Sequence, residues 1–420
     1  MNMRIERPGY LRELMNKRGN GQVKVITGVR RCGKSYLMGQ IFKERLLEEG
    51  VPHDRIVEMA FDRYRNRSYR DPETFLSWAL ERLSGQGHSY LLLDEVQLLG
   101  DFAEVLIDLM AEPGVDIYVT GSNARLLSKD VITEFRGRGD EIRMAPLSFS
   151  EFMSAYDGDV AVGYEEYATY GGMPVVAALS SGAEKAGYLT SLFDEIYLAD
   201  LVERNAIRDE GGLRAVLDVL SSNIGSLTNP KRISDALRSR NSGKGPGPET
   251  VRSYISCLED AFLIEEAQRY DVRGMAYIDS PFKYYFADVG LRNARMNFRQ
   301  AEPSHAMENV IYNELRGRGF GVDVGVVTSY GKDAKGKTTR VTREVDFVCN
   351  KGDRRYYVQS AYALPDQAKL EQEQASLMRI DDSFRKVIVV HDPIVPHYNE
   401  RGIYMVGIRD FLLDPNSLDS

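Results

Sequence analysis

Cysteine is scarce in this chain, with three among 420 residues, at positions 32, 257 and 349. Their wide spacing excludes a disulfide framework and the paired cysteines of a zinc site. Long hydrophobic runs are also missing, because no stretch approaches the roughly 18–20 unbroken apolar residues that a membrane span needs. What remains is an ordinary globular composition, 43% hydrophobic and 28% charged.

The first 21 residues carry many charges and lack the apolar core of a signal peptide. We therefore expect a reduced, cytoplasmic protein that has no contact with a membrane. The net charge of −8 argues against a protein that coats nucleic acid by bulk charge, although it leaves room for a local DNA-binding patch. The length predicts two to four domains.

A phosphate-binding loop is predicted near the N-terminus. Residues 23–27 (VKVIT) form a β-branched run typical of a buried strand, and residues 36–42 have the pattern of an apolar helix. Between them, residues 28–35 (GVRRCGKS) match G-x-x-x-x-G-K-[ST] at every fixed position. In this context backbone N–H groups surround phosphate oxygens, and the helix N-terminus adds partial positive charge. The pattern predicts ATP and Mg²⁺ as cofactors.

The chemistry of this motif gives roles to its residues. Lys34 is expected to reach the β- and γ-phosphates, and the Ser35 hydroxyl is expected to bind Mg²⁺. The predicted nucleotide-binding residues of the loop are Gly28, Arg30, Arg31, Cys32, Gly33, Lys34, Ser35 and Tyr36.

Two acidic residues follow a second predicted strand, residues 89–93 (SYLLL). Asp94 is expected to hold the Mg²⁺ shell and the nucleotide, and Glu95 to polarise the attacking water. An acidic pair at a strand end is often a solvated turn, but a neighbouring phosphate loop favours the catalytic interpretation. Because a site that only binds nucleotide needs no base, Glu95 predicts ATP hydrolysis.

A third predicted strand, residues 115–120, leads into Gly121-Ser122-Asn123. Ligands of open α/β sheets bind at the carboxyl ends of the strands, so a polar side chain here would lie near the nucleotide. Asn123 is favoured for this role and Ser122 is the alternative. A competing interpretation is that Asn123 only caps the next helix.

Five short motifs occur in order along the chain: residues 26–35 (ITGVRRCGKS), 93–97 (LDEVQ), 120–128 (TGSNARLLS), 135–138 (FRGR) and 146–149 (PLSF). This series resembles a family of prokaryotic AAA+ ATPases related to archaeal-type and STAND NTPases. The resemblance covers nearly the whole chain and is most specific in its first half. It implies an α/β fold: a P-loop NTPase parallel sheet in residues 1–150, a helical lid in 151–210, a winged helix in 211–300 and a restriction-endonuclease-like α/β domain in 301–420.

The resemblance also implies functional residues. Asn123 matches the sensor 1 position of AAA+ proteins, and Arg136 and Arg138 follow it where these proteins place an arginine finger. A finger acts on a neighbour's nucleotide and implies a homo-oligomer, such as a hexameric ring; solvated surface arginines are the alternative. Pro174 resembles the proline of the G-x-P motif in STAND-like lids, which packs near adenine, whereas an ordinary interhelical turn is the competing interpretation.

Three helical patterns between residues 213 and 259, followed by two β-rich stretches, predict the winged helix. In a DNA reader the third helix enters the major groove, which makes Thr250, Arg252 and Ser253 candidates, with Lys244 beside them. The charge excess in this region is weak, and winged helices also serve as rigid modules. Nucleic acid and an unknown protein partner therefore both stay open.

The last third resembles the core of PD-(D/E)xK nucleases, in which a helix glutamate, a strand aspartate and (E/Q)-x-K converge. Glu308, Asp346 and Gln359 fit the first three places, where acidic oxygens would hold Mg²⁺ at a scissile phosphate. Ala361 occupies the place of the lysine, and Lys369 is the nearest candidate for a migrated one. We expect a degenerate module that does not cleave DNA; an ATP-controlled nuclease is the alternative.

Overall fold

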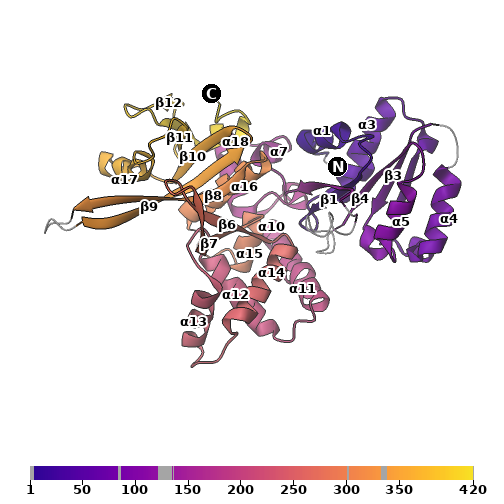
Figure 1. The fold of residues 1–420 in the computed structure, drawn as a ribbon, viewed down its shortest axis with the longest axis horizontal. Coiled ribbons are helices and arrows are strands. Elements are labelled where there is room, and N and C mark those ends of the chain that lie inside the picture. The colour runs from indigo at the N-terminus through magenta and orange to yellow at the C-terminus, as the bar shows by residue number, and fades with distance from the viewer. Residues whose placement is uncertain are drawn as a thin grey trace. The chain divides into compact units, whose positions relative to one another are not determined.

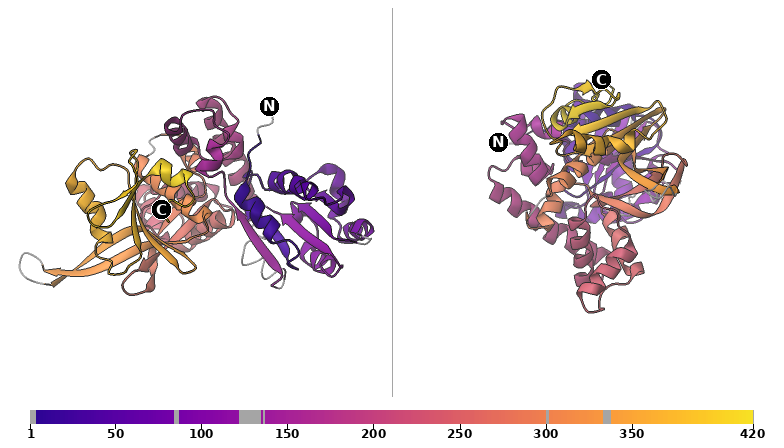
Figure 2. Two further views of the ribbon diagram at one scale, coloured as in Figure 1. Left: turned by 90° about the horizontal axis from the view of Figure 1, so that it is seen from above. Right: turned by 90° about the vertical axis from the view of Figure 1, so that its left-hand side faces the viewer.

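The computed structural model describes residues 4–83, 87–121, 135, 137–299, 302–332 and 338–419. The chain divides into two compact units, one comprising residues 1–146 and 260–262 and the other residues 147–259 and 263–420. Figure 1 follows the chain through both units, and Figure 2 gives two further views. Within the described residues, no helix is long and apolar enough to cross a membrane.

The first unit is built on a five-stranded sheet with the order β2-β3-β4-β1-β5. Its strands are β1 (Val23–Gly28), β2 (Ile56–Ala60), β3 (Ser89–Asp94), β4 (Val115–Thr120) and β5 (Gly139–Met144). All four neighbouring pairs run parallel, which confirms the predicted α/β fold with a parallel central sheet. Every residue of β1 is buried, as expected for a strand covered on both faces.

Helices lie on both faces of this sheet (Figure 1). They are α1 (Pro8–Asn16), α2 (Lys34–Tyr36), α3 (Lys43–Glu48), α4 (Pro72–Leu83) and α5 (Phe102–Leu109), with a π-helical segment at Leu37–Phe42. Strand β2 shows the alternation of faces: Glu58 forms an ion pair with Lys43 of α3, while Val57 and Met59 join the hydrophobic core with residues of α4 and α5.

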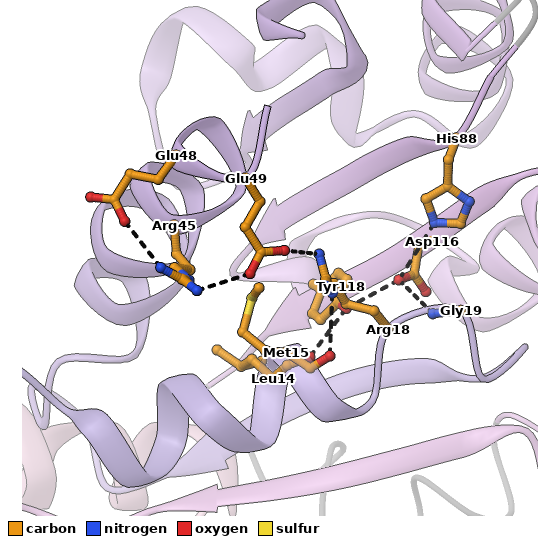
Figure 3. A network of polar contacts seen from close by, with 10 residues as sticks. All are labelled: Leu14, Met15, Arg18, Gly19, Arg45, Glu48, Glu49, His88, Asp116 and Tyr118. Carbon is orange, nitrogen blue, oxygen red and sulfur yellow. Dashed lines mark hydrogen bonds and ion pairs between the residues drawn. The ribbon is translucent and has the colours of Figure 1, made fainter. Parts of the chain in front are cut away.

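A polar network fixes the N-terminal segment to the sheet (Figure 3). Asp116 of β4 is buried, accepts a hydrogen bond from the Gly19 N–H at 3.0 Å and forms an ion pair with the buried Lys24 of β1. Arg18, just after α1, pairs with Glu49 at 2.7 Å. Because Lys24 and Asp116 lie at the starts of their strands, the network is at the edge of the sheet opposite the phosphate loop.

The second unit begins with helices. They are α7 (Phe149–Met153), α8 (Val160–Tyr170), α9 (Pro174–Ala177), α10 (Gly182–Ser191), α11 (Ala199–Arg204), α12 (Glu210–Ser222), α13 (Pro230–Arg240) and α14 (Pro248–Asp260), with a π-helical segment at Leu192–Leu198. Ser148 and Ser181 form capping boxes at the starts of α7 and α10. The segment predicted as a lid is thus largely helical, and its function as a lid stays a prediction.

An eight-stranded mixed sheet completes the second unit, in the order β12-β13-β11-β10-β9-β8-β6-β7. Its strands are β6 (Ile264–Asp271), β7 (Ala276–Phe286), β8 (Gly321–Lys332), β9 (Thr338–Lys351), β10 (Arg354–Ala361), β11 (Arg385–Val390), β12 (His397–Tyr398) and β13 (Tyr404–Gly407). The accompanying helices are α15 (Val289–Arg295), α16 (Pro303–Gly317), α17 (Gln367–Leu377) and α18 (Ile408–Leu413). Helix α16 packs against β8, β9 and β10.

The segment predicted to be a winged helix, residues 211–300, contributes two strands to this sheet. Three helices, α12–α14, and the antiparallel pair β6–β7 occur where the sequence predicts them. Strand β6 also pairs in parallel with β8, with Arg269 opposite Val324. The predicted boundary at residue 300 therefore lies between strands of one sheet, a long-range pairing that the local pattern does not encode.

Candidate functional sites

The phosphate-binding loop connects β1 to α2 and depends on two glycines. Gly28 ends the strand at φ 131°, and Gly33 precedes the helix at φ 105°, both in the region that side chains disfavour. A Cβ atom on Gly28 would lie 2.0 Å from the carbonyl oxygen of Met144 on β5. Only glycine fits at this close approach, so the motif's first fixed residue has a steric reason.

Lys34 lies inside the loop. Its buried Nζ donates hydrogen bonds to the carbonyl oxygens of Gly28 at 2.8 Å and Val29 at 3.0 Å. Both partners are neutral, and an N⁺–H···O⁻ bond to a phosphate is stronger than a bond to a carbonyl. The ammonium is therefore free to exchange them for an incoming nucleotide.

Other predicted contacts on the loop differ in exposure. Arg31 and Tyr36 are exposed, and Arg30 is partly buried. The Cys32 side chain is buried, and its Sγ donates to the carbonyl oxygen of Met144 at 3.6 Å. Cys32 thus packs the loop against β5, and its side chain does not face a nucleotide.

Strand ends bring Asp94 and Thr120 to Ser35. The Ser35 hydroxyl donates to Asp94 Oδ1 at 2.8 Å, and the Thr120 hydroxyl donates to the same oxygen. A hydroxyl and a carboxylate beside a phosphate loop suit Mg²⁺, which prefers oxygen ligands and keeps several waters. Phosphate oxygens and water would supply the rest of the shell when nucleotide is bound. Among the described residues, no group of three or more His, Cys, Asp or Glu could hold a metal.

Burial raises the pKa of Asp94 above its ordinary value. Hydrogen bonds from Thr120 and Ser35 oppose this shift, and the neighbouring Glu95 adds to it. A divalent cation would reverse the shift, because its charge favours the carboxylate form. The electrostatics of this corner thus fit a cation site.

Glu95 occupies a turn at φ 52°, an uncommon conformation outside glycine that concentrates at functional sites. Its N–H donates to Thr120 Oγ1 at 3.2 Å, and its carboxylate accepts a hydrogen bond from the Gln97 amide. Thr120 and Gln97 belong to none of the roles predicted from the sequence. The available signals were a polar residue ending the third strand and a Gln two residues after the acid.

Of the remaining residues predicted for ATP hydrolysis, the structure describes Arg138. Asn123, its alternative Ser122 and Arg136 lie outside the described residues. Arg138 is exposed, and its carbonyl oxygen accepts a hydrogen bond from the N–H of Val23, the first residue of β1, at 2.9 Å.

Pro174 starts α9 in the second unit, on a loop that Asp288 holds. The buried Asp288 carboxylate accepts hydrogen bonds from the N–H groups of Gly172 at 2.7 Å and Leu291 at 3.0 Å, and so caps α15. Burial raises the pKa of Asp288 to about 6, although these hydrogen bonds lower it. Asp288 had no assigned role in the sequence, and it ties the loop of Pro174 to a helix more than a hundred residues away.

The nuclease-like acids converge on a lysine that the sequence analysis missed. Glu308 of α16 and Asp346 of β9 are buried. Lys283 of β7 places its Nζ 2.8 Å from Glu308 Oε1, 2.8 Å from Glu344 Oε1 and 3.8 Å from Asp346 Oδ1. The Tyr285 hydroxyl also donates to Glu308 Oε1, at 2.6 Å. A single charged residue in the aromatic stretch 283–286 (KYYF) was the available signal.

The charges of this cluster shift one another's pKa values. Burial lowers the pKa of Lys283, but Glu308, Asp346 and Glu344 outweigh it and raise that pKa overall. Burial and the charge of Glu308 raise the pKa of Asp346, against the lowering effect of Lys283. Three carboxylates thus share one ammonium, which favours a proton on Asp346.

Gln359 contacts this cluster through the backbone of Asp346. Its Oε1 accepts a hydrogen bond from the Asp346 N–H at 3.4 Å, and its Nε2 donates to Glu373 at 3.1 Å. Lys369 pairs with Glu373 at 2.6 Å. The lysine that reaches Glu308 and Asp346 is therefore Lys283 and not Lys369, a difference created by the pairing of β7 into the sheet.

Comparisons with known proteins agree with the fold of the first unit. Residues 20–153 match the family model of an AAA domain, and residues 162–302 match a domain of unknown function, DUF8612. An uncharacterized protein of Haemophilus influenzae is 33% identical over 418 residues, covering 97% of this chain and 98% of the relative. The uncharacterized protein MJ1544 of Methanocaldococcus jannaschii is 26% identical over 405 residues, covering 93% and 85%.

Among solved structures, the Aeropyrum pernix ORC2 protein in ADPNP–ADP complexes aligns with 73% of this chain and 92% of its own. The identity is 14% and the TM-score 0.38, a similarity too low to support a function. The match to the AAA domain model agrees with the geometry of the phosphate loop and with the parallel sheet around it. The chain belongs to the same family as the Haemophilus influenzae protein, and its first unit is an AAA-type P-loop ATPase domain.

Proposed function

We propose that this chain is a Mg²⁺-dependent, ATP-hydrolysing AAA+ ATPase that works as an oligomeric machine or switch, with C-terminal modules that bind a partner. The observation that carries the proposal is the meeting of Ser35, Thr120 and Asp94 at the phosphate loop, with Glu95 as the next residue. A scaffold that only holds nucleotide needs no carboxylate base there.

Each group has one task in this proposal. Lys34 exchanges its carbonyl partners for β- and γ-phosphate oxygens, while Ser35 and Asp94 hold Mg²⁺. The ion, when bound, neutralises charge on the phosphoryl group. Glu95, held by Gln97, accepts the proton of the attacking water.

The proposed homo-oligomer follows from the proposed arginine fingers, Arg136 and Arg138. The six-residue strand β1 separates the backbone of Arg138 from the phosphate loop of its own chain. This position supports action on a neighbouring chain's nucleotide, and hence a homo-oligomer. We assign Asn123 to orient the attacking water and Pro174 to report nucleotide state through the lid.

Glu95→Gln tests the assignment of the base. Its amide cannot accept the proton of water, so we expect ATP binding close to that of the parent and turnover lower by roughly 100-fold or more. Phosphate release and nucleotide binding are measured on the full chain. Glu104→Gln, an exposed change on α5, is the matched control and should leave both unchanged. Turnover at the parental rate in Glu95→Gln would remove Glu95 from the mechanism.

A second candidate is an ATP-controlled, metal-dependent DNA nuclease. Lys283 favours it, because this ammonium lies at the acids of the nuclease-like core even though Ala361 carries no charge. The same contacts also count against it, since an ammonium bonded to Glu308 and Glu344 already neutralises groups that a metal would need. We therefore favour a module that binds without cleaving.

The nuclease alternative is tested on supercoiled and linear DNA with Mg²⁺ or Mn²⁺, with and without ATP. We expect no cleavage, because the acids are held by Lys283. Metal-dependent nicking that disappears in Asp346→Ala would establish the nuclease. Nicking that persists in this variant would identify a contaminant.

A further inference from the structure

Strands β8 and β9 extend beyond the rest of their sheet as a two-stranded antiparallel ribbon (Figures 1 and 2). Strand β6 pairs with β8 as far as Val326, and β10 pairs with β9 from Phe347 onward. Past these points, in the described part of the sheet, residues 327–332 and 338–343 pair with each other alone. We call these two stretches the basic arm.

The charge of this region contrasts with that of the chain. Residues 327–332 and 338–343 contain three basic residues and no acidic residue, in a protein whose net charge is −8. They also contain five serines and threonines. Basic and hydroxyl side chains are the groups with which proteins contact phosphates. A two-stranded ribbon without neighbouring strands is only marginally stable in water, so its length needs a reason other than folding. Its basic and hydroxyl side chains suit it to bind a polyanion.

One face of the arm leads to the carboxylate cluster. Arg340, Thr342 and Glu344 alternate along β9 and therefore share a face. Thr328 lies opposite Thr342, and Arg340 donates to the Thr328 hydroxyl at 3.3 Å. The same face continues to Glu344, whose side chain is 34% exposed and bonded to Lys283.

We propose that the basic arm binds the phosphate backbone of double-stranded DNA. A two-stranded ribbon fits the major groove, and phosphate contacts position it there. Helix α14, the surface that the sequence suggested, is less suited: Arg252 is paired with Glu249 at 3.0 Å, whereas Arg340 donates to a neutral hydroxyl. The inference rests on the proposed function only in treating the C-terminal modules as the partner-binding part.

The test measures fluorescence anisotropy of a labelled duplex of about 30 base pairs with the full chain at several stated ionic strengths. The double variant Arg340→Glu, Thr342→Glu reverses the charge of the arm face, and it should weaken binding about tenfold or more and flatten the salt dependence. Arg340→Lys keeps the charge and should bind within about twofold of the parent. Arg354→Glu, an exposed reversal on β10 of the same sheet, is the matched control.

Several results would overturn the inference. They are unchanged affinity in the double variant, no binding of the duplex by the parent, binding of RNA alone, or loss of binding in Arg252→Glu and not in the arm variant. Equal melting temperatures show that a loss is not unfolding, and Thr342→Glu alone replaces the double variant if its melting temperature falls.

ATP binding is measured on the same samples, because the two proposals can then fail separately. A chain that binds the duplex through the arm but does not bind ATP would refute the proposed function and leave this inference standing. A chain that hydrolyses ATP but ignores the duplex would do the reverse.

Discussion

Lys34 of the first unit and Lys283 of the second are both buried near acidic residues, and they have different partners. Lys34 donates to two neutral carbonyl oxygens, while Asp94 nearby is bonded to hydroxyl groups. Lys283 is bonded directly to Glu308 and Glu344. An ammonium held by neutral groups can accept an anion, whereas one held by buried carboxylates is already neutralised. Similar residue types therefore indicate ligand binding at Lys34 and internal pairing at Lys283.

The largest effect is expected when the exchangeable lysine is removed. Lys34→Ala should abolish nucleotide binding, because two charge-assisted hydrogen bonds to the phosphates are lost, about 4 kcal/mol or roughly 1000-fold in affinity. Binding of a fluorescent ATP analogue measures this. Lys43→Ala, which removes an ion pair on α3 of the same unit, is the control and should bind normally. If Lys34→Ala binds as the parent does, the ammonium does not exchange its partners.

Removal of the neutralised lysine should instead reduce stability. Lys283→Met leaves three carboxylates without their cation, which we expect to cost about 3 kcal/mol in the free energy of unfolding at pH 8. The loss should be smaller at pH 5, because burial raises the pKa of Asp346 and its protonation relieves the repulsion among the acids. Urea unfolding at the two pH values measures both effects.

Lys369→Met is the matched control for that change. Its side chain is 39% exposed and pairs with Glu373, so its removal should change stability by less than about 1 kcal/mol. Equal stabilities of Lys283→Met and Lys369→Met would show that Lys283 does not hold the cluster together. The contrast between Lys34 and Lys283 would then fail.

The smallest effect concerns Asp288, a buried carboxylate held by backbone N–H groups. Because burial raises its pKa to about 6, the folded state keeps a proton that the unfolded state releases near pH 4. Its contribution to stability should therefore fall by on the order of 2 kcal/mol as the pH rises from about 4 to about 6, and level off above that. Thermal unfolding across this range measures the slope, which Asp288→Asn should remove. An unchanged slope in the variant would assign it to other groups.

Local sequence was enough to predict the phosphate loop and the acidic strand end, because each is a short, continuous motif. The motif at residues 28–35 fixes where a strand becomes a helix, and Asp94 and Glu95 follow directly on another strand. Parallel strands put these ends at one edge of a sheet, so the contact between Ser35 and Asp94 could be expected from the order of elements. Thr120 and Gln97 were not foreseen, because hydrogen bonds of single polar side chains leave no periodic pattern.

In the second unit, the sequence determined which elements form, and the tertiary structure decided what they do together. The resemblance to PD-(D/E)xK nucleases pointed to Glu308, Asp346 and Gln359 on a helix and two strands. Their cation could not be found in this way, because Lys283 lies on a strand assigned to another module and reaches the acids only when β6 pairs with β8 and carries β7 into the same sheet. Strand periodicity specifies which side chains share a face, but it does not specify the neighbouring strand, because that depends on contacts between residues far apart in the chain.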